Sequence, residues 1–141
     1  MSVRSFLICF CLVATLLQTS CGDKEIFEPA GAAEYLINNQ TSDELRVTFI
    51  TSQELGLMTT DDLDEIAVGQ SLLVHTDGII GVNPQPTDSF SQITITRAND
   101  TQQSFTLSPI DNQLWEVLER NLGDTGYGLT IYQLTVTDED F

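Results

Sequence analysis

His75 is the single histidine in a chain of 141 residues, and Asp77 follows it two positions later. Residues two apart share one face of a strand, and a Ser-His-Asp hydrolase needs a histidine between its nucleophile and an acid. His75 also closes the run LLVHTDG directly before an Asp-Gly turn signal, where a solvated histidine is expected. We favour the solvated histidine, so the sequence assigns no catalytic residue and predicts no enzyme.

Carboxylates are the second group that could do chemistry. Asp61, Asp62, Asp64 and Glu65 place four acids within five residues, and such oxygen ligands suit calcium. Their spacing differs from an EF-hand loop, and the acid run 138–140 could join them only if the fold brings both to one end. A solvated loop is the favoured interpretation. Carboxylate pairs also serve glycosidases, but 21 acids leave no pair distinct.

No cluster of cysteine and histidine suits zinc or iron. We therefore expect no cofactor.

A candidate binding loop lies at 77–86, where Ile79, Ile80 and Val82 stand between glycines and two spaced prolines. Loops at the end of a rigid sandwich commonly carry recognition, and exposed apolar residues there would mark a surface for a partner. The alternative is that these three side chains turn inward and plug the open end of the sandwich.

The N-terminal segment has the three parts of an export signal. Arg4 gives it a positive charge, the apolar run FLICFCLVATLL extends from Phe6 to Leu17, and small polar residues precede Cys21. An apolar run of about 12 residues is about 18 Å long as a helix, shorter than the roughly 30 Å hydrocarbon layer. Of the three cysteines, Cys9 and Cys11 lie inside the signal, so only Cys21 would survive cleavage.

The segment LLQTSCG, from Leu16 to Gly22, resembles a bacterial lipobox, although Gln18 stands where an aliphatic residue is usual. The resemblance implies that the chain is cut before Cys21 and that this cysteine carries acyl chains such as palmitate. Two or more acyl chains give stable membrane anchoring. The alternative is an ordinary signal peptide, cut near Ser20, that leaves a free thiol on Cys21.

Residues 21–33 are acidic and rich in small side chains, which predicts a lipidated tether between the signal peptide (1–20) and a domain at 34–141. Acids directly after the cysteine, here interrupted by Lys24, resemble the export signal of Bacteroidetes-type lipoproteins. The turn NNQTS at 38–42 and the ending TDEDF at 137–141 are also similar to small lipoproteins of that group. This resemblance implies an outer-membrane address, with surface exposure favoured over a periplasmic face, and no particular activity.

The rest of the chain alternates apolar and polar residues with the period of strands. Strands are expected at 35–38, 45–49, 65–68, 71–75, 93–96, 104–107, 114–118 and 129–137. The fold class is therefore all-β, an antiparallel immunoglobulin-like or transthyretin-like sandwich of about seven to eight strands. The run LWEVLER at 114–120 could instead form a helical turn. Between Ile131 and Tyr132 the apolar residues switch from odd-numbered to even-numbered positions. This switch suggests a bulge or a strand covered on both faces.

Charge restricts the possible partners. Five basic residues stand against 21 acidic ones, a formal net charge of −16. Nucleic acid needs clustered Lys and Arg, so it is excluded as a partner. We expect a lipid-anchored, non-catalytic binding or structural module of the cell envelope, whose partner would be an envelope protein or a glycan. The alternatives are a small exported hydrolase and a subunit of a surface filament assembled by strand donation.

Overall fold

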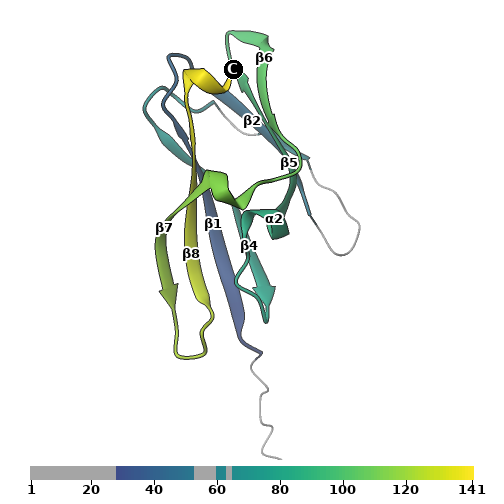
Figure 1. The fold of residues 1–141 in the computed structure, drawn as a ribbon, viewed down its shortest axis with the longest axis vertical. Coiled ribbons are helices and arrows are strands. Elements are labelled where there is room, and N and C mark those ends of the chain that lie inside the picture. Colours follow the sequence, from purple (N-terminus) through teal and green to yellow (C-terminus); the bar gives the residue numbers. More distant parts are fainter. Residues whose placement is uncertain (1–27, 53–59, 63–64) are drawn as a thin grey trace, which may run out of the picture.

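The computed structural model describes residues 28–52, 60–62 and 65–141. The predicted signal peptide, Cys21 and most of the tether lie outside these residues, as does Asp64. The described chain forms two four-stranded sheets that give a β-sandwich-like fold (Figure 1). The first has the order β4(Ser71–Ile80)-β1(Ala30–Asn39)-β8(Gly128–Val136)-β7(Trp115–Leu122). The second has the order β3(Thr60–Asp62)-β2(Leu45–Thr51)-β5(Phe90–Arg97)-β6(Asp100–Leu107).

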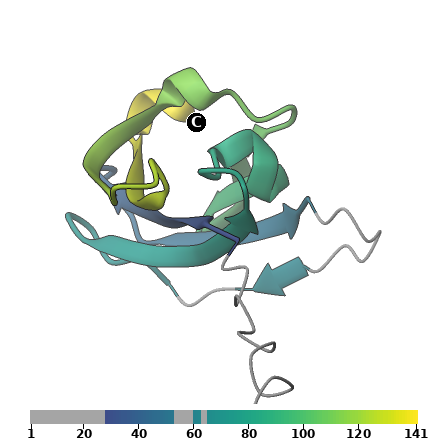
Figure 2. The same cartoon turned by 90° about the horizontal axis from the view of Figure 1, so that it is seen from below.

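The described residues also form three short helical elements: α2(Pro86–Ser89), η1(Asn112–Leu114) and η2(Asp138–Asp140). Seen from below, the first sheet curves, and α2 lies on its concave side (Figure 2). The mostly β architecture in two sheets confirms the coarse expectation from the sequence.

The first sheet is mixed, so the prediction of a purely antiparallel sandwich is wrong. β1 pairs with β8 in parallel, Tyr35 opposite Tyr132, and with β4 in antiparallel fashion. β7 and β8 form an antiparallel hairpin, so β7 also runs antiparallel to β1. Alternation along a strand records which face is buried and carries no information on the direction of its neighbours.

The core lies between the two sheets and follows the predicted alternation. On β1 the odd positions are buried, among them Ala33, Tyr35 and Ile37, and on β2 Leu45 and Val47 face them across the core. Aromatic rings fill the centre, where Tyr35 meets Phe90 edge to face at 4.9 Å, Trp115 at 5.7 Å and Tyr132 in a stack at 5.6 Å.

Several element boundaries differ from the expectation. β1 begins at Ala30, four residues before the predicted domain start. Segment 65–68 is not a strand, since only Ile66 forms an isolated bridge, to Leu45. The doubtful segment at 114–120 is largely strand β7, and α2 was not foreseen.

The bulge suspected in β8 lies on its neighbour. β7 pairs Val117 with Tyr132 but Glu119 with Ile131, so the extra residue is Leu118. On β8 the even positions face the core throughout, and Ile131 is half-buried on the opposite face of the sheet. The apolar phase change in the sequence therefore reflects two partly covered faces.

The chain after β4 folds back over the start of β1. Gly31 N donates to the carbonyl of Val82 (3.0 Å), and Gly81, with φ of 74°, donates to the carbonyl of Pro29 (2.8 Å). Asn83 then bridges to the β7–β8 hairpin, because its Nδ2 donates to the carbonyl of Gly126 (2.9 Å). These bonds hold the start of β1, the turn after β4 and the β7–β8 hairpin together.

Those three segments form one end of the molecule, which we call the tether end because the predicted tether precedes β1 (Figure 1). The C-terminus and the hairpin between β5 and β6 lie at the opposite, distal end (Figure 1).

Candidate functional site

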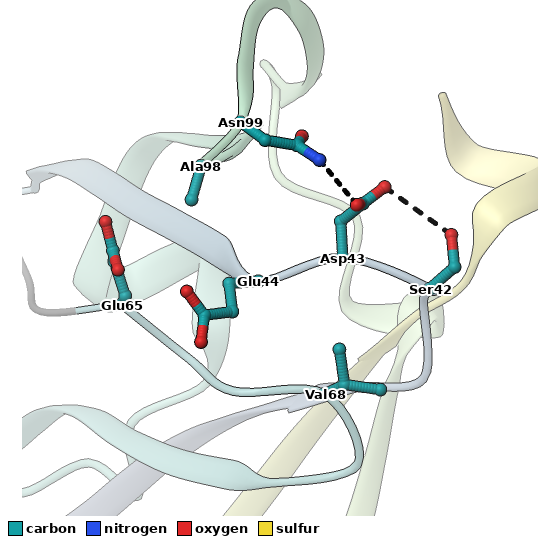
Figure 3. A pocket seen from close by; sticks show the side chains of 7 residues that line it. All are labelled: Ser42, Asp43, Glu44, Glu65, Val68, Ala98 and Asn99. Atoms are coloured by element: carbon teal, nitrogen blue, oxygen red, sulfur yellow. Dashed lines mark hydrogen bonds between the residues drawn. The ribbon is translucent and has the colours of Figure 1, made fainter.

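An open polar pocket of about 420 Å³ lies at the distal end (Figure 3). Three connections build it: the loop between β1 and β2, the segment between β3 and β4, and the turn between β5 and β6. Its lining consists of small, acidic and amide side chains with one exposed aliphatic residue: Ser42, Asp43, Glu44, Glu65, Val68, Ala98 and Asn99.

Asn39, fully buried at the end of β1, shapes two of these connections. Its amide nitrogen donates to the carbonyls of Asp43 (2.8 Å) and Ile66 (2.9 Å). Its side-chain oxygen accepts from both the backbone N–H (2.9 Å) and the hydroxyl (2.8 Å) of Thr41. An asparagine that closes such a local turn is a common solution at the end of a strand. The NNQTS motif therefore positions the pocket wall.

One side of the pocket is neutralised by Arg97. Its guanidinium pairs with Asp43 and donates to Oδ1 of Asp138 (2.8 Å), and it lies 4.8 Å from the ring centroid of Phe141. Asp43 also accepts from Nδ2 of Asn99 (2.6 Å). Both carboxylates are thus occupied, and Arg97 ties the C-terminal turn to the loop between β1 and β2.

These contacts shift the titration of the pair. The pKa of Asp138 lies below its usual range because its carboxylate accepts hydrogen bonds from the backbone and hydroxyl of Ser42 and from Arg97. The pKa of Arg97 is raised further, chiefly by its hydrogen bond to Asp43. Arg97 and Asp138 therefore remain charged at neutral pH.

The other side of the pocket carries two carboxylates, of which Glu65 is paired and Glu44, among the residues described, is not. Glu65 uses Oε1 to accept from Arg46, with 3.0 Å to Nε and 2.5 Å to Nη2. Within the described part of the chain, the carboxylate of Glu44 makes no hydrogen bond or ion pair. Figure 3 shows Glu44 between Glu65 and the exposed side chain of Val68. This arrangement offers carboxylate acceptors beside a small apolar contact.

The predicted calcium residues do not gather there as a set. Asp61 and Asp62 lie on β3, where the structure describes the backbone alone, and Glu65 is paired with Arg46. Asp138, from the second acid run, is held by Arg97. Among the residues described, no group of three or more His, Cys, Asp or Glu side chains could hold a metal ion.

His75 and Asp77 share the core-facing side of β4, opposite Tyr35 and Ala33 of β1. β4 continues to Ile80, so the expected turn at Asp77-Gly78 is absent and the prediction of a solvated histidine at a strand end is wrong. The His75 ring lies within 5.2–6.2 Å of the rings of Phe90, Phe49 and Tyr35. Pairing with β1 extends the strand beyond the local turn signal.

Asp77 takes part in a hydrogen-bonded row that the sequence did not indicate. The hydroxyl of buried Ser89 donates to Oδ2 of Asp77 (2.6 Å) and lies 2.7 Å from the hydroxyl of Tyr35. Ser89 stands at the end of α2, next to Phe90. This row joins α2 to the sheet, and its serine hydroxyl is enclosed in the protein, which favours a structural role.

The candidate binding loop is not a single loop: Ile79 and Ile80 end strand β4, and Val82 lies in the turn that follows. Ile79 is half-buried opposite Gly31, whereas Ile80 and Val82 are exposed. The plug interpretation therefore does not apply to Ile80 and Val82.

Comparisons with protein-family models, with curated proteins and with solved structures found no match. Within the described residues, no helix is both long and apolar enough to cross a membrane.

Proposed function

We propose that the chain is a lipid-anchored lipoprotein of the bacterial cell envelope, of the Bacteroidetes type and placed in the outer membrane. In this proposal it acts as a non-catalytic binding module. Cys21 carries the acyl chains, and the distal pocket contacts a partner protein or glycan. The observation that carries the proposal is the position of the pocket. It opens at the end of the fold opposite the start of β1, where a ligand can reach it when the N-terminal side is held at a membrane.

The strand order supports a transthyretin-like rather than an immunoglobulin-like arrangement. An immunoglobulin-like sandwich keeps its first, second, fourth and fifth strands in one sheet. Here β1 and β4 belong to one sheet, and β2 and β5 belong to the other. We therefore retain the transthyretin-like alternative.

The chemistry of the pocket favours a cationic group on the partner. Glu44 and the second oxygen of Glu65 are the available acceptors, and a charge-assisted hydrogen bond to a carboxylate is among the stronger polar contacts in proteins. Val68 can contact the aliphatic stem of a lysine or arginine. The net charge of −16 would also steer a positive partner toward the molecule.

The two alternatives have less support. A hydrolase would need a reactive group at a cleft, but His75 packs among aromatic rings and Ser89 is buried. Strand donation needs an accessible sheet edge, and bulges discourage such pairing. The outer strands of the first sheet, β4 and β7, both carry register shifts.

Replacing Cys21 with serine should leave an unprocessed precursor without acyl label, because serine offers no thiol for lipid transfer. Metabolic labelling with a radioactive fatty acid and the electrophoretic size of the product measure this. The control is Cys9→Ser inside the predicted signal peptide, which should be labelled and cut like the wild type. A labelled Cys21→Ser product would refute acylation at this site.

Replacing Glu44 with glutamine should weaken binding of a short oligolysine peptide by about five- to tenfold, as expected for loss of a charge-assisted contact worth about 1–1.5 kcal/mol. Isothermal titration calorimetry at about 0.15 M salt measures it. Glu116→Gln on exposed β7 removes the same charge elsewhere and is the control. Equal weakening by both variants would mean that the peptide senses only the overall charge.

A further inference from the structure

Three large apolar side chains are exposed at the tether end. Ile80 is 64% exposed, Val82 42% and Leu122 40%. We call this set the tether-end surface. Exposed apolar groups gathered at one place mark a contact with a partner or a membrane, and no part of the site described above uses them.

Backbone contacts place all three residues beside the chain entry. Ile80 pairs directly with Ala30, the first residue of β1. Val82 accepts from Gly31, and its neighbour Asn83 accepts from the backbone N–H of Gly128 (3.2 Å). Gly128 in turn pairs with Leu122. The three residues thus lie at the end of β4, in the turn over the start of β1 and on the β7–β8 hairpin, which share one end of the fold (Figure 1). The strand register places Ile80 on the outer face of the sheet and Leu122 on its core-facing side, so the tether-end surface comprises both sides of that end.

Among the residues that the structure describes, few acids accompany these side chains. Glu28, Glu119 and Asp124 are exposed toward this end, while Asp77 directs its carboxylate to Ser89. The distal end, by contrast, carries the acidic pocket and the C-terminal acid run. With this distribution of charge, the tether end can contact an uncharged or zwitterionic surface, whereas contact with an anionic surface is unfavourable.

The tether is short enough to keep this surface near a membrane. Cys21 lies nine residues before Ala30, which pairs with Ile80, and nine residues span at most about 32 Å. If acyl chains hold Cys21 in the bilayer, the tether-end surface stays within that distance of the lipid, and contact becomes an intramolecular event at high effective concentration.

We propose that the tether-end surface docks on the zwitterionic lipid surface to which Cys21 is anchored, inserting Ile80, Val82 and Leu122 at the headgroup level. This inference rests on the proposed acylation of Cys21. Docking fixes the orientation of the domain, so that the acidic distal pocket faces away from the membrane.

A nitroxide probe on Ile80→Cys tests the inference in the full, acylated chain. Signal cleavage removes Cys9 and Cys11 and acylation occupies Cys21, so the introduced cysteine is the single free thiol. The protein is reconstituted in phosphatidylethanolamine–phosphatidylcholine vesicles, and the accessibility of the probe to oxygen and to a water-soluble nickel complex is compared.

The matched control is Leu73→Cys, a leucine on the same strand that is 47% exposed and lies about 23 Å further along it. We expect the oxygen-to-nickel ratio at position 80 to exceed that at position 73 at least fivefold. Adding Val82→Asp and Leu122→Asp should lower the ratio at position 80 to the control value.

The outcomes separate the two proposals. Equal ratios at positions 80 and 73, in protein that floats with the vesicles, would overturn docking and leave the lipid anchor intact. Protein that lacks acyl chains and fails to float would overturn the anchor and, with it, this inference.

Discussion

Replacing Gly31 with alanine should destabilise the domain by about 2–3 kcal/mol, although it adds one methyl group. A Cβ built at Gly31 would lie 2.2 Å from the carbonyl oxygen of Val82 and 2.6 Å from the Cα of Asn83. Both are backbone atoms of the chain that folds over β1, so relief requires moving that chain. The same movement would strain the bridge from Asn83 to the β7–β8 hairpin.

Chemical denaturation of residues 28–141, followed by circular dichroism, measures the loss in the free energy of unfolding. In a thermal scan the melting temperature should fall by roughly 10 °C. Gly78→Ala is the control, because Gly78 lies on the neighbouring strand and a Cβ built there would make an ordinary contact, 3.7 Å to the carbonyl oxygen of Gly31. We expect that change to alter stability by less than about 1 kcal/mol. Similar losses in both variants would mean that glycine matters here for reasons other than the close approach.

The strands were predictable because their signal is local. Alternation at Leu45, Val47 and Phe49 and at Ile93 and Ile95 records burial on one face of a sheet, and each of these residues is in the core. Pairing direction depends instead on where the chain returns. No local pattern indicates that β8 lies beside β1 in parallel.

The end of β4 illustrates how a distant partner overrides a local signal. Asp77-Gly78 is a common turn sequence, yet β1 pairs with this segment as far as Ile80. The actual turn uses Gly81, whose positive φ suits glycine. Because the turn falls later, Ile80 and Val82 are exposed at the tether end.

The distal pocket was harder to predict because its parts are far apart in the sequence. The NNQTS turn signal was visible, but Asn39 gains its role only when segment 65–70 lies against it. Arg97 stands at the end of β5, and its partners Asp43 and Asp138 come from opposite parts of the chain. Among 21 acids, the sequence cannot say which two a given arginine selects.

The second large effect expected is a loss of stability in alkali, caused by Tyr35. Its side chain is fully buried, and its hydroxyl lies 2.7 Å from that of Ser89, which in turn donates to Asp77. Burial is the main reason that the pKa of Tyr35 is raised well above its usual value of 10, and the nearby carboxylate of Asp77 raises it further. The folded protein therefore holds this phenol neutral when the unfolded chain would ionise it.

Because the folded pKa lies above the unfolded one, the contribution of Tyr35 is complete below about pH 10 and is lost as the pH rises above that value. The expected slope is about 1.4 kcal/mol per pH unit, or roughly 2.5 kcal/mol between pH 10 and 12. Denaturant unfolding of residues 28–141 across this range measures it. Tyr35→Phe should lower stability at neutral pH by about 1 kcal/mol, for the lost hydrogen bond, and remove most of the alkaline slope. Tyr127→Phe, the same change in the β7–β8 hairpin, should keep the slope. Parallel losses in the wild type and Tyr35→Phe would show that other groups cause the alkaline unfolding.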